Sequence, residues 1–175
     1  KKGKAPSDAI VLFGKVSLDK FESEKDGSPA KWKVQGKKFT VVGKTGNIQT
    51  KERFGDCQLH IEWRTPPTDV KEGKKGQANG NSGIYLMGKY EVQVLNSYIN
   101  KTDYDRMAGS VYSQHSPLVN ASLAPGKWQA YDIIFTAPQF NSDGSVRSFG
   151  RMTVFHNRVL IQNNIKIEGP TQAYS

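Results

Sequence analysis

The stretch Cys57-Gln58-Leu59-His60-Ile61-Glu62-Trp63-Arg64 alternates strictly between apolar and polar side chains. Successive side chains of a β-strand point to opposite faces, so the apolar set would face one side and the polar set the other. Two prolines follow at positions 66 and 67, and proline ends a strand because it cannot donate a hydrogen bond to the ladder. The pattern predicts a half-buried strand of an antiparallel sheet.

Similar runs recur along the chain, separated by turns rich in glycine, proline and asparagine, and no segment has a long helical period. The two runs around His156-Asn157 predict a hairpin, because asparagine tolerates the positive φ of a tight turn. We therefore predict an all-β sandwich or jelly roll. Its other strands are expected at 39–42, 84–87, 90–95, 110–112, 129–136, 151–156 and 159–162.

The length of 175 residues and the hydrophobic fraction of 36% fit one folded domain. We expect this domain at 10–175, after a flexible lead-in at 1–9 of the kind that remains when an export signal is removed. No run approaches the eighteen apolar residues of a membrane-spanning helix. Cys57 is the only cysteine, and its place in an apolar alternation predicts a small buried side chain.

The net charge of +9 is not concentrated in one basic cluster of the sequence. Lysine supplies 19 of the 25 basic residues, and residues 1–51 hold twelve lysines against five acidic residues. The guanidinium groups of arginine dominate specific contacts with phosphates and bases, and the chain has few arginines. The distribution predicts a solvated surface and no nucleic-acid partner.

Two of the predicted strands carry acids and other polar groups on one face. Glu62 and Arg64 share the polar face of the first strand, and Glu91 and Gln93 share a face of the strand at 90–95. If the two strands belong to one sheet, these side chains line a common groove, as in sugar-binding sandwiches. The alternative is the ordinary wet face of an antiparallel sheet.

The histidines at 60, 115 and 156 show no metal-ligand spacing, so no metal site and no cofactor are predicted. His60 shares a face with Glu62 and is a candidate base. His156 is expected to have a structural role in its hairpin. The long glycine-rich loop at 65–83 leads into the strands that follow it, and loops of this length are usually functional or mobile.

Several segments resemble the 3-keto-disaccharide hydrolase domain family. They are FGDCQLHIEWR at 54–64, GNSGIYLMGKYEVQVL at 80–95, PLVNAS at 117–122, GKWQAYDIIF at 126–135, and TVFHN at 153–157 followed by Val159-Leu160. They cover most of 10–170 in the expected order. The resemblance implies a concanavalin- or laminarinase-like jelly roll of two antiparallel sheets. It also implies an exported protein, periplasmic, outer-membrane-associated or extracellular, from a Bacteroidetes-type bacterium, with a possible lipid anchor upstream.

The resemblance implies a glycosidase-type enzyme, acting on disaccharides or glycosides that carry a ketone at position 3 of one sugar. Two chemistries are open: hydrolysis by Glu62 and Glu91 as acid and base, or β-elimination and water addition with Glu91 or His60 as the single base. The candidate catalytic residues are Glu91, Glu62 and His60. The candidate substrate-binding residues are Arg64, Asn81, Ser82, Tyr85, Gln93, Asn96, Tyr112 and Gln114.

A carbohydrate-binding module on the same fold is the alternative, with Tyr85, Tyr90, Tyr112 and Trp128 as stacking platforms. An adhesion or scaffold domain is a third interpretation.

The chain departs from the family at Asn96, where aspartate is usual, and at Arg158, where glycine is usual. Asn96 removes a carboxylate near the predicted site. The family's domain also continues into a last strand after the segment matching 165–171, and we expect this strand to be missing or to lie beyond the sequence.

Overall fold

The computed structural model describes residues 5–14, 17–67 and 75–171. Internal contacts divide the chain into two compact units, Lys1–Arg53 and Phe54–Ser175. The four-stranded sheet and the main core both belong to the second unit. The single domain expected over 10–175 stays a prediction. Among its described residues, the first unit contains short strand pairs.

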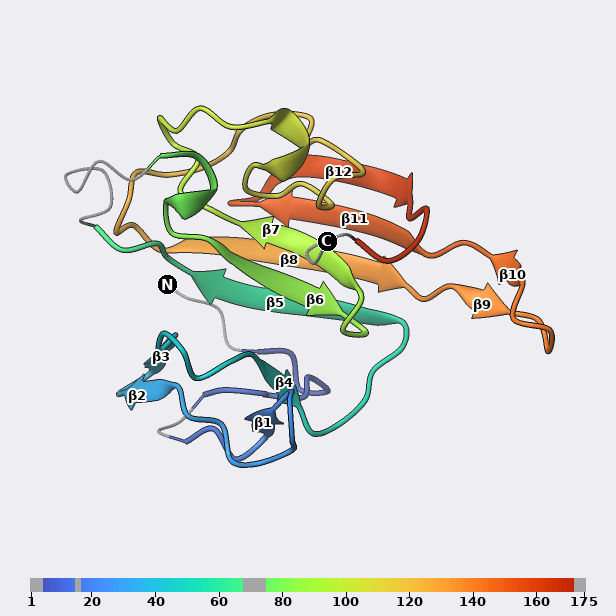
Figure 1. Ribbon diagram of the computed structural model, residues 1–175, viewed down its shortest axis with the longest axis horizontal. Coiled ribbons are helices and arrows are strands. Elements are labelled where there is room, and N and C mark those ends of the chain that lie inside the picture. The colour runs from blue at the N-terminus through green and yellow to red at the C-terminus, as the bar shows by residue number, and fades with distance from the viewer. Residues whose placement is uncertain (1–4, 15–16, 68–74, 172–175) are drawn as a thin grey trace. The chain divides into compact units, whose positions relative to one another are not determined.

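The first unit contains two antiparallel strand pairs (Figure 1). β1 (Phe21–Ser23) pairs with β4 (Ile48–Thr50), and β2 (Lys33–Gln35) pairs with β3 (Lys38–Thr40). The centre of the Phe39 ring lies 4.8 to 5.9 Å from the ring centres of Phe13, Trp32 and Phe21. This cluster supplies the apolar contacts that such short strands need.

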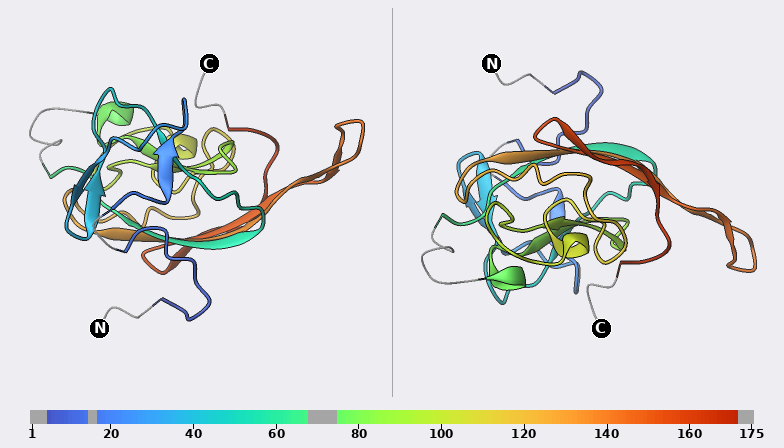
Figure 2. Two further views of the ribbon diagram at one scale, coloured as in Figure 1. Left: turned by 90° about the horizontal axis from the view of Figure 1, so that it is seen from below. Right: turned by 90° about the horizontal axis from the view of Figure 1, so that it is seen from above.

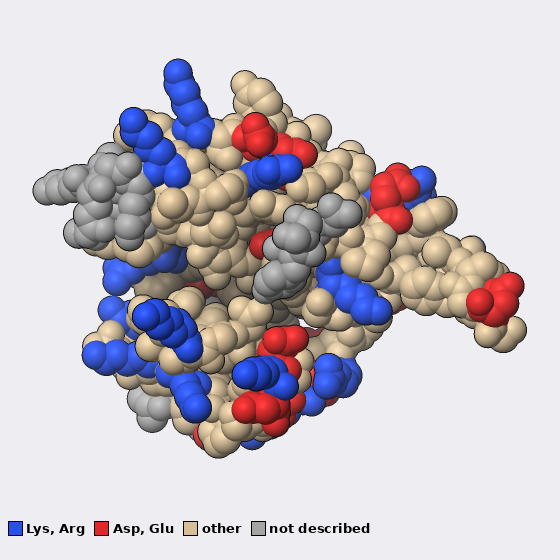
Figure 3. Space-filling view, viewed as in Figure 1, with Lys and Arg blue, Asp and Glu red and all other residues tan. Residues whose placement is uncertain are grey.

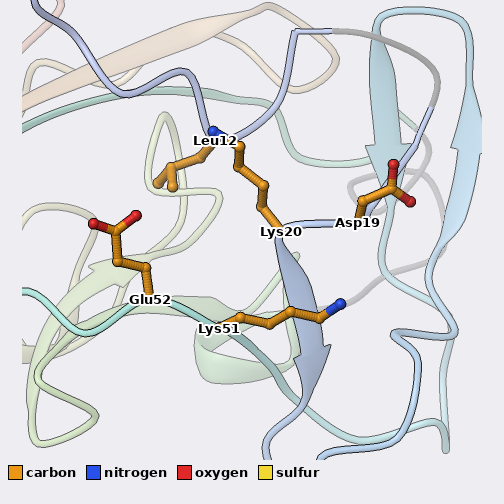
Figure 4. Close-up of a pocket in the computed structure, with 5 residues that line it drawn as sticks. All are labelled: Leu12, Asp19, Lys20, Lys51 and Glu52. Atoms are coloured by element: carbon orange, nitrogen blue, oxygen red, sulfur yellow. The ribbon is translucent and has the colours of Figure 1, made fainter.

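A hollow of about 200 Å³ lies in the first unit. Its lining residues are Leu12, Asp19, Lys20, Lys51 and Glu52 (Figure 4). The four charged residues are exposed and of both signs. Exposed charges of both signs are ordinary for a solvated surface, so we assign this hollow no ligand.

The second unit contains a four-stranded antiparallel sheet in the order β12–β11–β8–β5. A separate hairpin of β6 and β7 lies over one face of this sheet (Figures 1 and 2). The bounds are β5 Cys57–Trp63, β6 Ser82–Leu86, β7 Tyr90–Val94, β8 Gln129–Thr136, β11 Arg151–His156 and β12 Val159–Lys166. Short 3₁₀ helices are formed by η1 (Gly76–Ala78) and η2 (Tyr104–Arg106).

Two further short strands continue the β8–β11 pair. β9 (Gln139–Phe140) and β10 (Val146–Ser148) pair with each other. They form a ribbon that extends beyond the end of the sheet (Figure 2).

The core of the second unit lies between the sheet and the β6–β7 hairpin. Tyr90 of the hairpin packs on Phe135 of the sheet, with ring centres 5.9 Å apart. The buried Tyr131 hydroxyl donates a hydrogen bond of 2.8 Å to the Gln93 carbonyl and so ties the two layers together. The predicted all-β sandwich is therefore confirmed; its buried apolar residues include Trp63, Val92, Val94, Ile133, Met152, Val154 and Ile161.

The predicted strands at 129–136 and 151–156 are confirmed at both ends. The strand at 57–64 ends one residue earlier, at Trp63, and the strand predicted at 159–162 continues to Lys166. The strand predicted at 110–112 is wrong. Val111 forms isolated bridges to Val92 and His115, and the chain turns at Ser113, whose φ is 57°.

The β11–β12 hairpin turns one residue later than the sequence predicted. Asn157 and Arg158 have φ values of 52° and 70°, and His156 pairs with Val159. A two-residue turn with positive φ at both positions matches the twist of a hairpin. Arg158 thus adopts a conformation that favours glycine, the residue usual at this position in the family it resembles.

Basic side chains are interspersed with acidic ones on the face shown in Figure 3. Among the described residues, no helix is long and apolar enough to span a membrane.

The side chain of His156 is fully buried, so its structural role extends beyond the hairpin turn. The ring stacks on Trp63 and meets Tyr131 edge-on, at centroid distances of 5.5 and 4.8 Å. Nε2 forms a hydrogen bond of 2.8 Å with Gln129 Oε1. Burial lowers the pKa of His156 from 6.5 to about 4, because the charged form loses its hydration.

We therefore expect the protein to lose stability as the pH falls below about 6.5. The unfolded chain binds a proton at His156 there, whereas the folded chain resists it until about pH 4. From pH 7 to pH 5 this group should lower the free energy of unfolding by about 2 kcal/mol, measured by urea denaturation. The loss should shrink in His156→Phe and persist in His60→Gln. An unchanged pH dependence in His156→Phe would contradict the assignment.

Candidate functional site

The outer face of the β6–β7 hairpin carries the polar side chains of the region. In β7, Val92 and Val94 belong to the core, so Glu91 and Gln93 point to the opposite face. Both are nonetheless buried, with 4% and 1% of their surface exposed. The register pairs Tyr85 of β6 with Glu91 and Gly83 with Gln93, which places all four residues on one face.

The other edge of β7 is occupied by residues 110–112. The Gln93 N–H donates to the Ser110 carbonyl at 3.0 Å, and the Tyr112 N–H donates to the Glu91 carbonyl at 3.2 Å. With the bridge between Val92 and Val111, this sets Tyr112 opposite Glu91 and Ser110 opposite Gln93. The face therefore has two rows across three chain segments: Tyr85–Glu91–Tyr112 and Gly83–Gln93–Ser110.

Glu91 is the acidic residue in these rows. Few hydrogen bonds compensate for the burial of its carboxyl group. Burial raises the pKa of Glu91, and a hydrogen bond from the Tyr85 side chain opposes part of that shift. Oε2 is buried without a hydrogen-bond partner among the described residues. A buried carboxyl with a raised pKa and an unpartnered oxygen is typical of a functional site.

Gly83 makes the space that the Glu91 carboxyl occupies. A Cβ at this position would lie 2.8 Å from Glu91 Cδ and 2.9 Å from Tyr85 Cε2. Both distances are shorter than van der Waals contact. The glycine of the GNSGIY segment is therefore required by side-chain packing and not by a special backbone angle.

Gln93 is held in place by a residue that the sequence analysis did not single out. Gln77 of η1 accepts hydrogen bonds from Gln93 Nε2 at 3.0 Å and from Asn81 Nδ2 at 3.2 Å. Its own Nε2 donates to Thr102 Oγ1 and to the Arg106 carbonyl. The only sequence signal for Gln77 was its place in the 65–83 loop, of which 68–74 lie outside the described residues.

A segment near the end of the described chain fixes the backbone of Glu91. The Glu91 N–H donates to Thr171 Oγ1 at 3.0 Å, and both the N–H and the hydroxyl of Thr171 donate to the Lys89 carbonyl. The side chain of Gln114 bonds to the backbone of Glu168 and Gly169 at 3.1 and 2.9 Å and holds this segment. No local pattern in the sequence indicates the role of Thr171, because its partners lie about 80 residues away.

Asn96 and Ser82 lie at the far end of the hairpin from Tyr85 and Glu91. Asn96 is buried and bonds to Asn79 through its N–H at 3.0 Å and through Nδ2 at 3.2 Å. Ser82 begins β6 opposite Val94. Asn96 therefore fixes the chain that enters β6, and its role in substrate binding stays a prediction.

The common groove predicted for Glu62, Arg64, Glu91 and Gln93 is wrong. β5 belongs to the four-stranded sheet, and its apolar side chains face the same core as Val92. Glu62 therefore points to the outer face of that sheet, on the opposite side of the sandwich from Glu91. The alternation fixed the faces of each strand correctly, but it carries no information on which strands share a sheet.

The outer face of the four-stranded sheet holds its own polar residues. His60 Nδ1 lies 2.6 Å from Asp132 Oδ1 in a directly opposed, exposed cross-strand pair. The Arg64 guanidinium lies 5.1 Å from the Trp128 ring centre. The structure thus separates His60, Glu62 and Arg64 from the Glu91 site.

The four aromatic residues expected to form stacking platforms do not lie together. Tyr90 is in the core and Trp128 is near Arg64, whereas Tyr85 and Tyr112 flank Glu91. Among the described residues, no group of three or more His, Cys, Asp or Glu side chains is arranged to hold a metal ion.

The site therefore consists of a buried acid between two tyrosines on the polar face of a β-sandwich. The chain belongs to the 3-keto-alpha-glucoside-1,2-lyase-like domain family, whose model matches residues 8–175. The resemblance noted in the sequence is thereby confirmed.

Solved structures agree with this membership. A proposed glycosyl hydrolase from Parabacteroides distasonis ATCC 8503 is 48% identical, with a TM-score of 0.92 over 98% of this chain and 71% of that chain. A second proposed glycosyl hydrolase from the same organism is 16% identical, with a TM-score of 0.59 over 94% and 72% of the two chains, and shares the fold. No curated protein matches the chain. The family model and the 48% identical structure indicate a glycosyl-hydrolase-like protein.

The packing at Gly83 gives a direct test of the site geometry. Gly83→Ala should displace the Glu91 carboxyl and lower the free energy of unfolding by about 1–3 kcal/mol, the usual cost of overpacking. Gly55→Ala is the matched control, since a Cβ there meets nothing within 4 Å, and it should change stability by less than about 0.5 kcal/mol. Equal effects in urea denaturation would show that Gly83 is not under packing constraint.

Proposed function

We propose that this protein cleaves glycosides that carry a ketone at C3, by β-elimination, with Glu91 as the base. The observation that carries the proposal is the buried Glu91 carboxyl, with its raised pKa, between Tyr85 and Tyr112. Membership of a family described as 3-keto-alpha-glucoside-1,2-lyase-like supports the same reaction class.

The ketone makes a single base sufficient. A C3 carbonyl acidifies the proton on C2, and Glu91 would remove that proton as the C2 electrons move toward the carbonyl as an enolate. Collapse of the enolate forms the C1–C2 double bond and breaks the bond from C1 to the leaving oxygen. The leaving oxygen takes up a proton, and the products are an unsaturated 3-keto sugar and a free alcohol. Addition of water to the double bond would complete a net hydrolysis.

A raised pKa suits Glu91 to this task. A carboxylate of ordinary pKa is a weak base near neutral pH, and burial makes it stronger by destabilising the charged form. The Tyr85 hydroxyl donates a hydrogen bond to the Glu91 carboxylate before the reaction. We assign it the role of donor to the enolate oxygen once Glu91 has taken up the C2 proton. Gln77 keeps the Gln93 amide fixed beside these groups.

Hydrolysis by two acids is the weaker candidate. Such enzymes need two carboxyl groups about 5–5.5 Å or about 6.5–9.5 Å apart across the bond that breaks. Glu62 was the partner predicted for Glu91, and it points to the other side of the sandwich. Neither row around Glu91 contains a second acid.

Replacing the base tests the proposal. Glu91→Gln keeps the size of the side chain but cannot accept the proton, so kcat/KM for a 3-keto-glucoside should fall by about 100-fold or more. Release of the alcohol and ultraviolet absorbance of the conjugated ketone are the measurements. Glu62→Gln is the matched control and should keep its activity.

Two results would contradict this assignment. Full activity in Glu91→Gln would exclude Glu91 as the base, and equal turnover of the unoxidised glucoside would exclude the ketone-dependent route. Binding without release would favour a carbohydrate-binding module. Export to the periplasm or cell surface stays a prediction from the family resemblance.

A further inference from the structure

A small pocket lies beside Tyr112 in the second unit. It has a volume of about 260 Å³ and is lined by Tyr112, Ser113, Gln114 and Pro170. Pockets for drug-sized ligands span about 300–1,000 Å³, so this one is of a size for a single sugar ring.

Tyr112 and Pro170 link this pocket to Glu91, the first across the strands and the second through Thr171. Tyr112 is the cross-strand neighbour of Glu91, and adjacent strands lie about 4.8 Å apart. Pro170 precedes Thr171, whose hydroxyl accepts the Glu91 N–H. A disaccharide that runs across the strands would therefore place one ring over Glu91 and the next ring beside Tyr112.

The walls of the pocket are held in place by contacts within the protein. Gln114 bonds to the backbone of Glu168 and Gly169, and the Ser113 N–H donates to the Asp105 carbonyl at 2.9 Å. The Arg106 guanidinium lies 6.0 Å from the Tyr112 ring centre. Such fixed walls lower the entropy that a ligand loses on binding.

The chemistry of the lining suits a sugar. The tyrosine ring offers an apolar face for the C–H groups of a pyranose and a hydroxyl for its polar edge. Ser113 and Gln114 line the pocket next to the tyrosine ring. The carbonyl groups of residues 169 and 170 face the Gln114 amide.

We infer that this pocket is the subsite for the second sugar, the unit released when the bond to the 3-keto sugar breaks. The inference rests on the proposed function for the site of the keto sugar. It makes Tyr112 a residue that determines specificity for disaccharides over glycosides with a small leaving group.

Binding measurements test the subsite without turnover. In a Glu91→Gln background, the Kd of a 3-keto-disaccharide and the Kd of methyl 3-keto-glucoside are measured by titration calorimetry. Adding Tyr112→Ala should weaken binding of the disaccharide about tenfold and binding of the methyl glycoside by less than about twofold. Adding Tyr112→Phe keeps the ring and should preserve the preference for the disaccharide. Tyr104→Ala, at a neighbouring tyrosine that is 78% exposed, is the matched control.

The outcomes separate the two proposals. Equal weakening for both ligands, no weakening, or no binding of the disaccharide would overturn the subsite. Selective weakening would support it even if the wild-type protein cleaved neither compound, and that second result would overturn only the proposed elimination.

Discussion

β7 is buried on both of its faces, and this constraint governs the rest of the second unit. Its inner face packs Val92 and Val94 against the four-stranded sheet, while Glu91 and Gln93 are buried on the outer face. A strand buried in this way must have all of its backbone polar groups satisfied. β6 bonds to one edge, and residues 109–112 with the Thr171 hydroxyl bond to the other. Segments that are distant in sequence are thereby fixed around one glutamate.

The polar side chains of β7 differ in how well they are satisfied. Gln93 uses both ends of its amide, since Nε2 donates to Gln77 and Oε1 accepts the Val94 N–H. Glu91 keeps one buried oxygen without a described partner. Its raised pKa means that the folded state binds its proton more tightly than the unfolded chain, so Glu91 lowers stability as the pH rises above its ordinary pKa. A cost of this kind is characteristic of residues retained for function.

The sequence predicted the strands well because side-chain alternation is a local property. The strands at 129–136 and 151–156 needed nothing beyond their own pattern, and Glu91 and Gln93 were correctly placed on one face. The pairing of strands into sheets is not local, which is why Glu62 was assigned to the wrong groove. Gln77 and Thr171 were missed for the same reason, since each acts on β7 from a distant part of the chain. The strand predicted at 110–112 was wrong because Ser113 has a positive φ, which a serine in the sequence does not indicate.

A single buried acid makes a different demand on its substrate than a pair of acids does. An acid–base pair can break an ordinary glycosidic bond, because one group protonates the leaving oxygen while the other activates water or attacks the sugar. A lone base has no such partner, and the C2 proton of an ordinary sugar is far too weak an acid for a carboxylate to remove. Under the proposed function, an oxidation at C3 must therefore come before this reaction. The ketone supplies the activation that a second carboxyl would otherwise provide, and the substitution of aspartate by Asn96 then removes no group that elimination by Glu91 requires.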